Sequence, residues 1–192
     1  FFRTYFAGNL DATRDLIELL EELIDPNLDV EVLLDGFMKS EDEDKLYDLY
    51  EFFRDLGDPF LAGMLCERLR QLKPEELAYL NNLAICLYSQ GKYDKAEPMY
   101  RECSELMTAK LGKDHPDTLD SINNLAICLK VQGKYDKAEP MYRECLKLRT
   151  AKLGKDHPST LRSIGNLAIW LGGQGKYAAA EAMSRAWREP RT

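Results

Sequence analysis

The sequence predicts an all-α fold, a right-handed superhelical solenoid built from antiparallel helix pairs. A stretch of 42 residues, from Leu77 to Thr118, recurs without a gap at Leu119 to Thr160 with 33 of 42 positions identical, and begins a third time at Leu161. Each copy holds two segments with apolar residues at helical spacing, separated by the turn sequence QGK. A fixed period of roughly 20 to 50 residues is typical of solenoids, in which each unit buries its apolar face only against its neighbours.

Four helices are expected before the first copy. Apolar residues at helical spacing predict helices over residues 10–24 and 28–38. The acidic stretch 41–44 then opens a third helix, because acidic side chains stabilise the positive end of a helix. Gly57-Asp58-Pro59 ends that helix, and a fourth follows over residues 60–72. The third and fourth helices are expected to pair as a 34-residue hairpin, residues 43–76.

In the 42-residue units, the first helix is expected over residues 74–89, 116–131 and 158–171. Each of these segments starts with a proline, which suits a first helical turn because the missing N–H has no partner there. The buried stripe of the first copy is expected to be Leu80, Leu83, Ala84 and Leu87, with Gly91 ending the helix.

The second helix of each unit is expected to open at Asp94 or at its copy Asp136. The aspartate would cap the helix while Glu97, copied as Glu139, reaches back to form a capping box. Pro98 falls at the edge of the first turn, where a proline costs less than in mid-helix. The expected core face, with its copies, is Ala96, Met99, Tyr100, Cys103, Leu106 and Ala109.

Units built as NNLA, then QGKYDKAEPMY, then LGKDHP resemble the tetratricopeptide repeats of kinesin light chains, and equally those of nephrocystin-like and NB-ARC-linked repeat proteins. The strong resemblance covers residues 77–177, and a looser one extends back to residue 43. It implies five parts: a degenerate, truncated repeat region over 1–42, a 34-residue repeat over 43–76, two 42-residue repeats over 77–118 and 119–160, and a divergent, truncated repeat over 161–192.

Both ends depart from the repeated pattern. In the third copy, Trp170 and Trp187 replace cysteines, Gly165 replaces the first asparagine of the NN pair, and the turn is loosened to Gly172-Gly173. These changes predict a reshaped end of the solenoid, as a cap or a docking face. Because a truncated solenoid exposes apolar faces, contacts with another chain or with missing sequence are expected at Phe1, Phe2, Tyr5, Phe6 and Trp187.

The composition is that of a soluble, folded protein, with 45% hydrophobic and 31% charged residues. No stretch approaches the roughly 18 apolar residues of a membrane helix, so no direct membrane insertion is expected. Residues 1–76 carry 8 basic and 20 acidic side chains, whereas residues 77–192 carry 18 and 13, which predicts surfaces of opposite sign. Five cysteines, four of them duplicated, do not form a disulfide framework, which favours a reducing, cytoplasmic location.

Residue types with catalytic or metal-binding chemistry have a structural explanation. His115 and His157 lie in identical LGKDHP loops before a first-turn proline, so we expect helix caps rather than metal ligands. The cysteines fall at core positions without a CxxC pattern, so we expect buried side chains. No phosphate loop, nucleophile elbow or His-carboxylate arrangement is found. The sequence therefore predicts no enzymatic activity, no cofactor, no metal site and no nucleic-acid partner.

The functional prediction rests on the first helices of the repeats. Opposite the leucine stripe, their faces combine amides with isoleucine, and an amide that donates and accepts at once can pair with an extended backbone. The resemblance implies that this face lines a concave groove, in which kinesin light chains hold extended acidic peptides. The candidate residues are Asn81, Asn82, Ile85, Tyr88, Asn123, Asn124, Ile127, Lys130, Arg162, Asn166 and Ile169. The alternative is that Asn123 and Asn124 serve contacts between adjacent hairpins.

The expected function is a non-enzymatic scaffold that binds a protein or peptide partner. The net positive charge of residues 77–192 favours an extended, acidic ligand near Asn123, Asn124, Lys130, Arg162 and Asn166. Two alternatives stay open at this point. The chain could be the sensor or regulatory repeat region of an NB-ARC-type signalling ATPase, or a structural linker in a large assembly.

Overall fold

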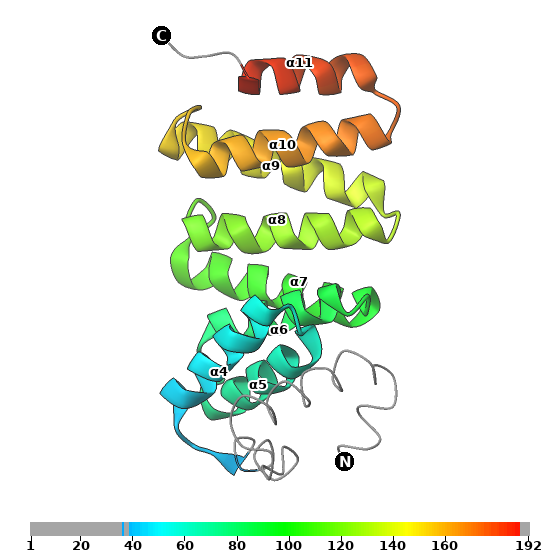
Figure 1. Cartoon of the computed structure of the whole chain (residues 1–192). Helices are drawn as coiled ribbons and strands as arrows, with labels where there is room; N and C mark the ends of the chain where they lie inside the picture. The colour runs from blue at the N-terminus through cyan, green and yellow to red at the C-terminus, as the bar shows by residue number, and fades with distance from the viewer. Residues whose placement is uncertain (1–35, 37–38, 189–192) are drawn as a thin grey trace. The chain divides into compact units, whose positions relative to one another are not determined.

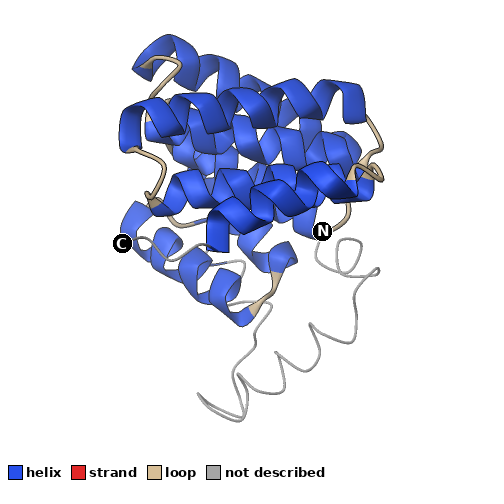
Figure 2. Cartoon of the chain, turned by 90° about the horizontal axis from the view of Figure 1, so that it is seen from above, coloured by secondary structure: helices blue, strands red, loops and turns tan. Residues whose placement is uncertain are grey.

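The computed structural model describes residues 36 and 39–188, and the chain divides into two compact units, 1–75 and 76–192 (Figure 1). Every element in the described residues is a helix, and short loops connect the helices (Figure 2). The helix predicted over 10–24 lies outside the described residues, and so does the one predicted over 28–38 apart from Gly36. The same holds for the apolar residues at the N-terminus and for the side chain of Trp187, so the contacts predicted there stay predictions.

One helix pair makes up the described part of the first unit, α4 (Glu43–Leu56) and α5 (Pro59–Leu72). The carboxylate of Asp42 accepts a hydrogen bond from the Lys45 N–H at 3.2 Å and so caps α4. Gly57 ends α4 at a φ of 82°, in the left-handed region that glycine adopts without strain. Asp58 then caps α5 by accepting from two backbone N–H groups. The predicted pairing of the third and fourth helices is thus formed by α4 and α5.

Three helix pairs make up the second unit, and each helix packs against the next (Figure 1). The first helices are α6 (Leu77–Ser89), α8 (Pro116–Val131) and α10 (Pro158–Gly173). The second helices are α7 (Tyr93–Leu111), α9 (Tyr135–Leu153) and α11 (Tyr177–Arg188). The predicted all-α solenoid of antiparallel helix pairs is confirmed.

The starts of the first helices agree with the prediction in α8 and α10 and differ in α6. His115 Nδ1 accepts from the Asp117 N–H at 3.3 Å, and His157 does the same for Ser159 at 3.2 Å, so both histidines are helix caps as predicted. The prediction that α6 starts at Pro74 was wrong. This helix begins at Leu77, because the Glu76 carboxylate accepts from the Ala78 N–H and takes the capping position.

The starts of the second helices correct a prediction. Helix α7 begins at Tyr93, and Asp94 therefore lies inside the first turn, where it faces the positive end of the helix but does not cap it. Glu97 forms no capping box; it pairs with Arg101 at 2.8 Å and with Lys134 of the next unit. The bond from Lys134 lowers the pKa of Glu97. Pro98 lies inside the helix, past its first turn.

The end of α10 also differs from the prediction. Gly172 and Gly173 were expected to loosen the turn, but both belong to the helix. The chain reverses at Gly175 instead, whose φ of 73° matches that of the equivalent glycine in each earlier unit. The turn glycine thus fixes the helix end, and the extra glycines do not move it.

The core is a continuous set of side chains between the paired helices. The leucine stripe of α6 is buried as predicted at Leu80 and Leu83, and Ala84 is fully buried. On α7 the predicted core face was partly wrong, because Leu106 is 43% exposed and Ala109 is also exposed, while Met107 is 8% exposed. The buried apolar residues of α7, at the helical spacing of four, three and four residues, are Ala96, Tyr100, Cys103 and Met107, and Ser104 is buried beside them.

The five cysteines are buried, as their pattern predicted, and no disulfide joins them in the described structure. The Cys103 thiol donates to the Leu77 carbonyl at 3.7 Å, and the Cys145 thiol donates to the Leu119 carbonyl at 3.5 Å. Burial raises the pKa of Cys103 and Cys128 to about 11 and that of Cys145 to about 12. The thiols therefore stay protonated in the fold at pH values where unfolded thiols ionise.

This difference predicts a loss of stability in alkali. Because the pKa of these thiols is raised on folding, their contribution is complete below the unfolded pKa of about 8.5 and is lost as pH rises toward 11 to 12. We expect the free energy of unfolding to fall between pH 8.5 and 10.5 in urea titrations followed by circular dichroism. Cys128→Ala should cost about 1 kcal/mol or less at pH 7 and should show a shallower pH dependence than the wild type. Identical slopes in the two proteins would contradict the assignment.

Candidate functional site

The first helices of neighbouring units lie side by side and are joined by asparagine pairs. The Asn124 side-chain nitrogen donates to the Asn81 oxygen at 3.4 Å, and the Asn166 nitrogen donates to the Asn123 oxygen at 2.8 Å. Each pair links the second position of the NN motif in one 42-residue repeat to the first position of the motif in the repeat before it. Four of the predicted site residues are thus brought together by inter-unit hydrogen bonds.

The asparagines were expected either to bind a ligand or to join adjacent hairpins, and these hydrogen bonds concern both interpretations. The contact between adjacent hairpins, which was the alternative to ligand binding, is present. Asn123 is 4% exposed, so its amide is largely occupied within the fold. Asn82, Asn124 and Asn166 are half-buried and keep surface in the same face. An amide can donate twice and accept twice, so the paired side chains retain further hydrogen-bonding capacity.

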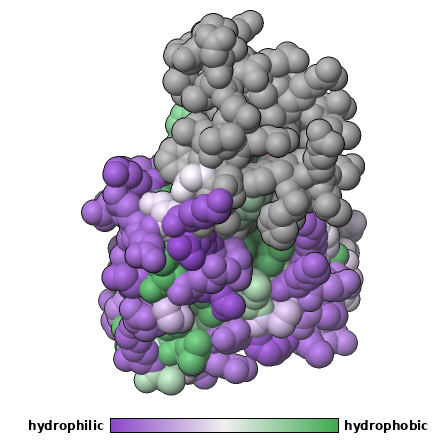
Figure 3. Space-filling view, turned by 90° about the horizontal axis from the view of Figure 1, so that it is seen from below, coloured by the Kyte–Doolittle hydropathy of each residue, from purple (hydrophilic) through white to green (hydrophobic). Residues whose placement is uncertain are grey.

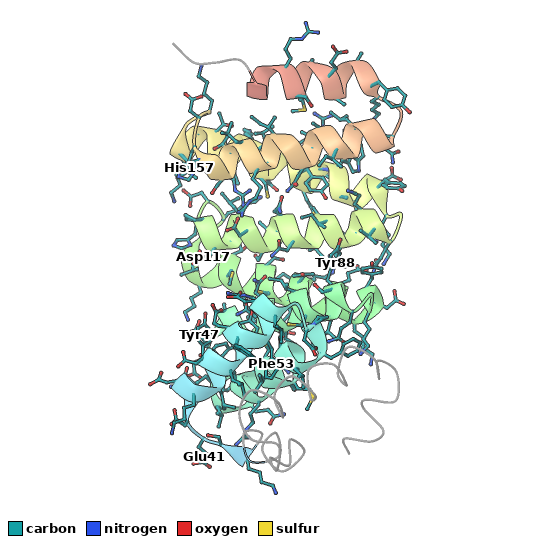
Figure 4. The ribbon with its side chains drawn as sticks, viewed as in Figure 1. Glu41, Tyr47, Phe53, Tyr88, Asp117 and His157 are labelled. Carbon is teal, nitrogen blue, oxygen red and sulfur yellow. The ribbon has the colours of Figure 1, made fainter. Side chains whose placement is uncertain are left out.

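The apolar candidates differ in exposure. Ile85 and Ile127 are partly buried and pack against the core cluster, whereas Ile169 is 63% exposed. Tyr88 packs its ring against Tyr93, with the two centroids 5.2 Å apart. Figure 4 shows Tyr88 at one edge of the second unit and Asp117 and His157 at the opposite edge, where the first helices begin. Ile169 is therefore the apolar candidate with the most surface to offer a ligand.

A charged network that the sequence did not predict lies between α8, α9 and α10. The carboxylate of Asp120 pairs with both Arg149 and Arg162. Arg149 is 1% exposed, and its Nη1 donates to Ser163 Oγ at 2.6 Å and to the Ser159 carbonyl at 3.4 Å. Burial lowers the pKa of Arg149, and the Asp120 carboxylate acts in the opposite direction. The guanidinium nevertheless stays charged at neutral pH.

A cavity of about 460 Å³ opens between α6, α7 and the start of α8. Its lining combines three carboxylates with one lysine, the two asparagines of the first 42-residue repeat and an apolar wall. The lining residues are Glu76, Leu77, Ala78, Asn81, Asn82, Met107, Lys110, Leu111, Asp117, Asp120 and Ser121. The cavity is therefore part of the face that carries the predicted site. On the face drawn in Figure 3, the described surface is mostly hydrophilic with small apolar areas.

Within residues 36 and 39–188, no three histidine, cysteine, aspartate or glutamate side chains gather in a way that could hold a metal ion. Among the helices described there, none combines the length and the hydrophobicity that crossing a membrane requires.

Comparison with known proteins supports the repeat assignment. The sequence profile of the tetratricopeptide repeat family matches residues 75–151 and again residues 120–186. Among curated proteins, no sequence is similar enough to count as a relative.

Similar folds occur among solved structures. BtubC (BKLC) from P. vanneervenii superposes with a TM-score of 0.68 and 17% identity, over 84% of this chain and 73% of that one. A Podosopora anserina protein proposed to be a kinesin light chain, with nearly identical TPR-like repeats, gives 0.65 and 20% identity over 97% and 89% of the two chains. MamA from Desulfovibrio magneticus RS-1 gives 0.60 and 14% identity over 91% and 90%.

At these identities the solved structures show the fold alone. The repeat fold itself indicates a scaffold for protein–protein interaction, and such scaffolds are typically not enzymes. The matched profile runs from residue 75 to residue 186 and so covers more than half of the chain. The protein belongs to the tetratricopeptide repeat family.

Proposed function

We propose that this protein is a non-enzymatic scaffold that binds an extended, acidic segment of a partner protein along α8 and α10. The observation that carries the proposal is the mixed surface left on these helices once their leucine face is buried. On α10, Ile169 is 63% exposed and the Arg162 side chain is 54% exposed, and Asn166 between them in sequence is half-buried. Lys130 on α8 is also half-buried. Exposed apolar area next to amides and cations suits an extended chain with acidic side chains.

The charge of the network supports the sign of the ligand. Asp120 is shared by two arginines, so the three groups together keep a net positive charge. Arg162 has five N–H donors, and one ion pair with Asp120 leaves donors that a ligand carboxylate can reach. Residues 77–192 carry 18 basic and 13 acidic side chains, which would also attract an acidic segment over longer distances. Five buried cysteines without a disulfide favour a reducing compartment, and we place the scaffold in the cytoplasm.

Charge substitutions test this proposal after partner capture. The partner is first identified by affinity capture with the longest available form of the chain, read by mass spectrometry. Its binding segment is then titrated against the wild type, against a double variant with Lys130→Glu and Arg162→Gln, and against Lys147→Glu. Lys147 is exposed on the second helix α9, so Lys147→Glu repeats a charge reversal outside the proposed groove.

We expect the double variant to bind about 2- to 30-fold more weakly at low salt, since each of the two exposed ion pairs contributes roughly 0.2 to 1 kcal/mol. The difference should shrink at high salt, because screening acts beyond about 8 to 10 Å in ordinary buffers. Lys147→Glu should bind like the wild type apart from a small, salt-sensitive change. Wild-type affinity of the double variant at low salt, or a footprint confined to residues 1–76, would show that the proposal is wrong.

A further inference from the structure

The cavity between α6, α7 and α8 has a counterpart one repeat later, between α8, α9 and α10. Because the copies align without a gap, each residue that lines the cavity has an equivalent residue 42 positions later in the sequence. Met107 corresponds to Arg149, Ser121 to Ser163, and Asp117 to Ser159. The two junctions therefore share a backbone framework but differ in three side chains, because Ala78, Met107 and Asp117 of the first correspond to Asp120, Arg149 and Ser159 of the second.

At the second junction, the chain fills this place with its own arginine. The Arg149 guanidinium is fully enclosed and donates to Ser163 Oγ, to the Ser159 carbonyl and to the Asp120 carboxylate. A junction of this type can thus enclose a guanidinium between a serine hydroxyl, a carbonyl at the start of a first helix and an acidic group. Such a set of acceptors matches the planar, forked donors of arginine.

At the first junction, the corresponding side chain is apolar and the recess is open. Met107 packs against Leu77 and Leu80, and the cavity of about 460 Å³ remains beside it. The Ser121 hydroxyl donates to the Thr118 carbonyl at 2.8 Å, so its oxygen can still accept. The first junction therefore keeps a serine acceptor, Ser121, but has no arginine to bind it. At the second junction Arg149 binds the equivalent serine, Ser163.

The charge of the lining favours a cation. Glu76, Asp117 and Asp120 face the cavity, against Lys110 as the cation among the lining residues. Asp120 is already held by two arginines, so Glu76 and Asp117 supply most of the attraction. Leu77, Met107 and Leu111 offer an apolar wall for an aliphatic stem.

We propose that this cavity binds an arginine side chain of a partner protein, in the manner in which Arg149 fills the second junction. The site goes beyond the acidic-segment proposal, because it uses residues 76–121 and takes a group of the opposite charge. A partner that used both sites would carry an arginine beside its acidic segment.

Two small probes test the site directly. N-acetyl-arginine N-methylamide is titrated into ¹⁵N-labelled protein, and N-acetyl-citrulline N-methylamide serves as its neutral isostere. For so small a ligand, binding in roughly the millimolar range is expected. Amide shift changes should concentrate in residues 76–82 and 117–121, and citrulline should bind at least about tenfold more weakly, because it lacks the charge.

Three variants make the test specific. Met107→Arg supplies the missing arginine from within the chain and should reduce binding of the arginine probe at least about tenfold. Leu106→Arg adds the same charge at an exposed neighbouring position and should leave binding within about twofold, since exposed charges are screened. Asp117→Asn alters an exposed carboxylate at the rim and should weaken binding severalfold without affecting the fold.

Equal shifts with arginine and citrulline would overturn the proposal, as would wild-type binding by Met107→Arg or shifts centred elsewhere. If Met107→Arg does not fold, Asp117→Asn together with the citrulline comparison decides the matter, because both use native-like protein. The outcome is independent of the acidic-segment test, since the probe has no carboxylate and neither Lys130 nor Arg162 lines the cavity.

Discussion

Replacing Asp120 by alanine is expected to lower the free energy of unfolding by about 3 kcal/mol. The substitution leaves the guanidinium of Arg149 buried at 1% exposure with the Ser163 hydroxyl and a carbonyl as its remaining partners. Breaking a buried ion pair typically costs about 3 to 5 kcal/mol, and the low end applies because the Asp120 side chain is itself 47% exposed. Urea unfolding followed by circular dichroism measures the change.

The first junction supplies the matched control for this prediction. At the positions equivalent to Asp120 and Arg149 it has Ala78 and Met107. A double variant with Asp120→Ala and Arg149→Met therefore copies a junction that the chain already builds, and should recover most of the lost stability, because no charge is left buried. The ion pair does not hold this junction if Asp120→Ala alone unfolds like the wild type. The same conclusion follows if the double variant is no more stable than Asp120→Ala.

Replacing Trp170 by alanine is expected to cost about 3 to 5 kcal/mol in the stability of the last helix pair. Trp170 is 4% exposed within the core cluster, and the Lys176 ammonium lies 4.9 Å from its ring centre. Truncating a buried tryptophan removes its transfer free energy and leaves a cavity. Because each repeat contacts only its neighbours, the loss should be concentrated in α10 and α11. Hydrogen exchange resolved by residue would show faster opening there than in α6 and α7.

The equivalent position one unit earlier gives the comparison for this variant. Cys128 occupies it, and Cys128→Ala removes far less buried volume from the same place in the repeat. A similar loss in both variants would mean that the position, rather than the indole, determines the cost. A uniform rise in exchange over the whole second unit after Trp170→Ala would contradict the local response.

The fold could be predicted because its signals are local and repeated. The LGKDHP loops place a histidine and a proline at the start of α8 and α10, and both histidines cap as expected. The errors arose where two local rules compete. At Asp94, the capping pattern gave way to the turn geometry set by Gly91, which starts the helix one residue earlier. At Leu106, hydrophobicity suggested the core, but the helical period from Ala96 selects Met107.

The candidate site was harder to predict from the sequence than the fold, because it depends on how neighbouring helices align. Nothing in the NN motif shows that its second asparagine donates to the first asparagine of the preceding unit. An arginine on a charged helix is usually exposed, so the burial of Arg149 was missed. One signal was available in the differences between the two copies. Three of the nine differing positions hold Ala78, Met107 and Asp117, which line the first cavity. Their equivalents at the second junction are Asp120, Arg149 and Ser159, which are joined there by hydrogen bonds from Arg149.

The difference between the two junctions affects which helix packs at which junction while the chain folds. Units with 33 of 42 identical positions can exchange places during folding, since most of their packing surfaces are the same. If α9 took the place of α7, Arg149 would be buried opposite Ala78, where the native second junction has the Asp120 carboxylate. If α7 took the place of α9, Met107 would face the charges of Asp120 and Arg162. We therefore expect the double variant of Asp120 and Arg149, although stable, to refold with a lower yield and more swapped dimer than the wild type.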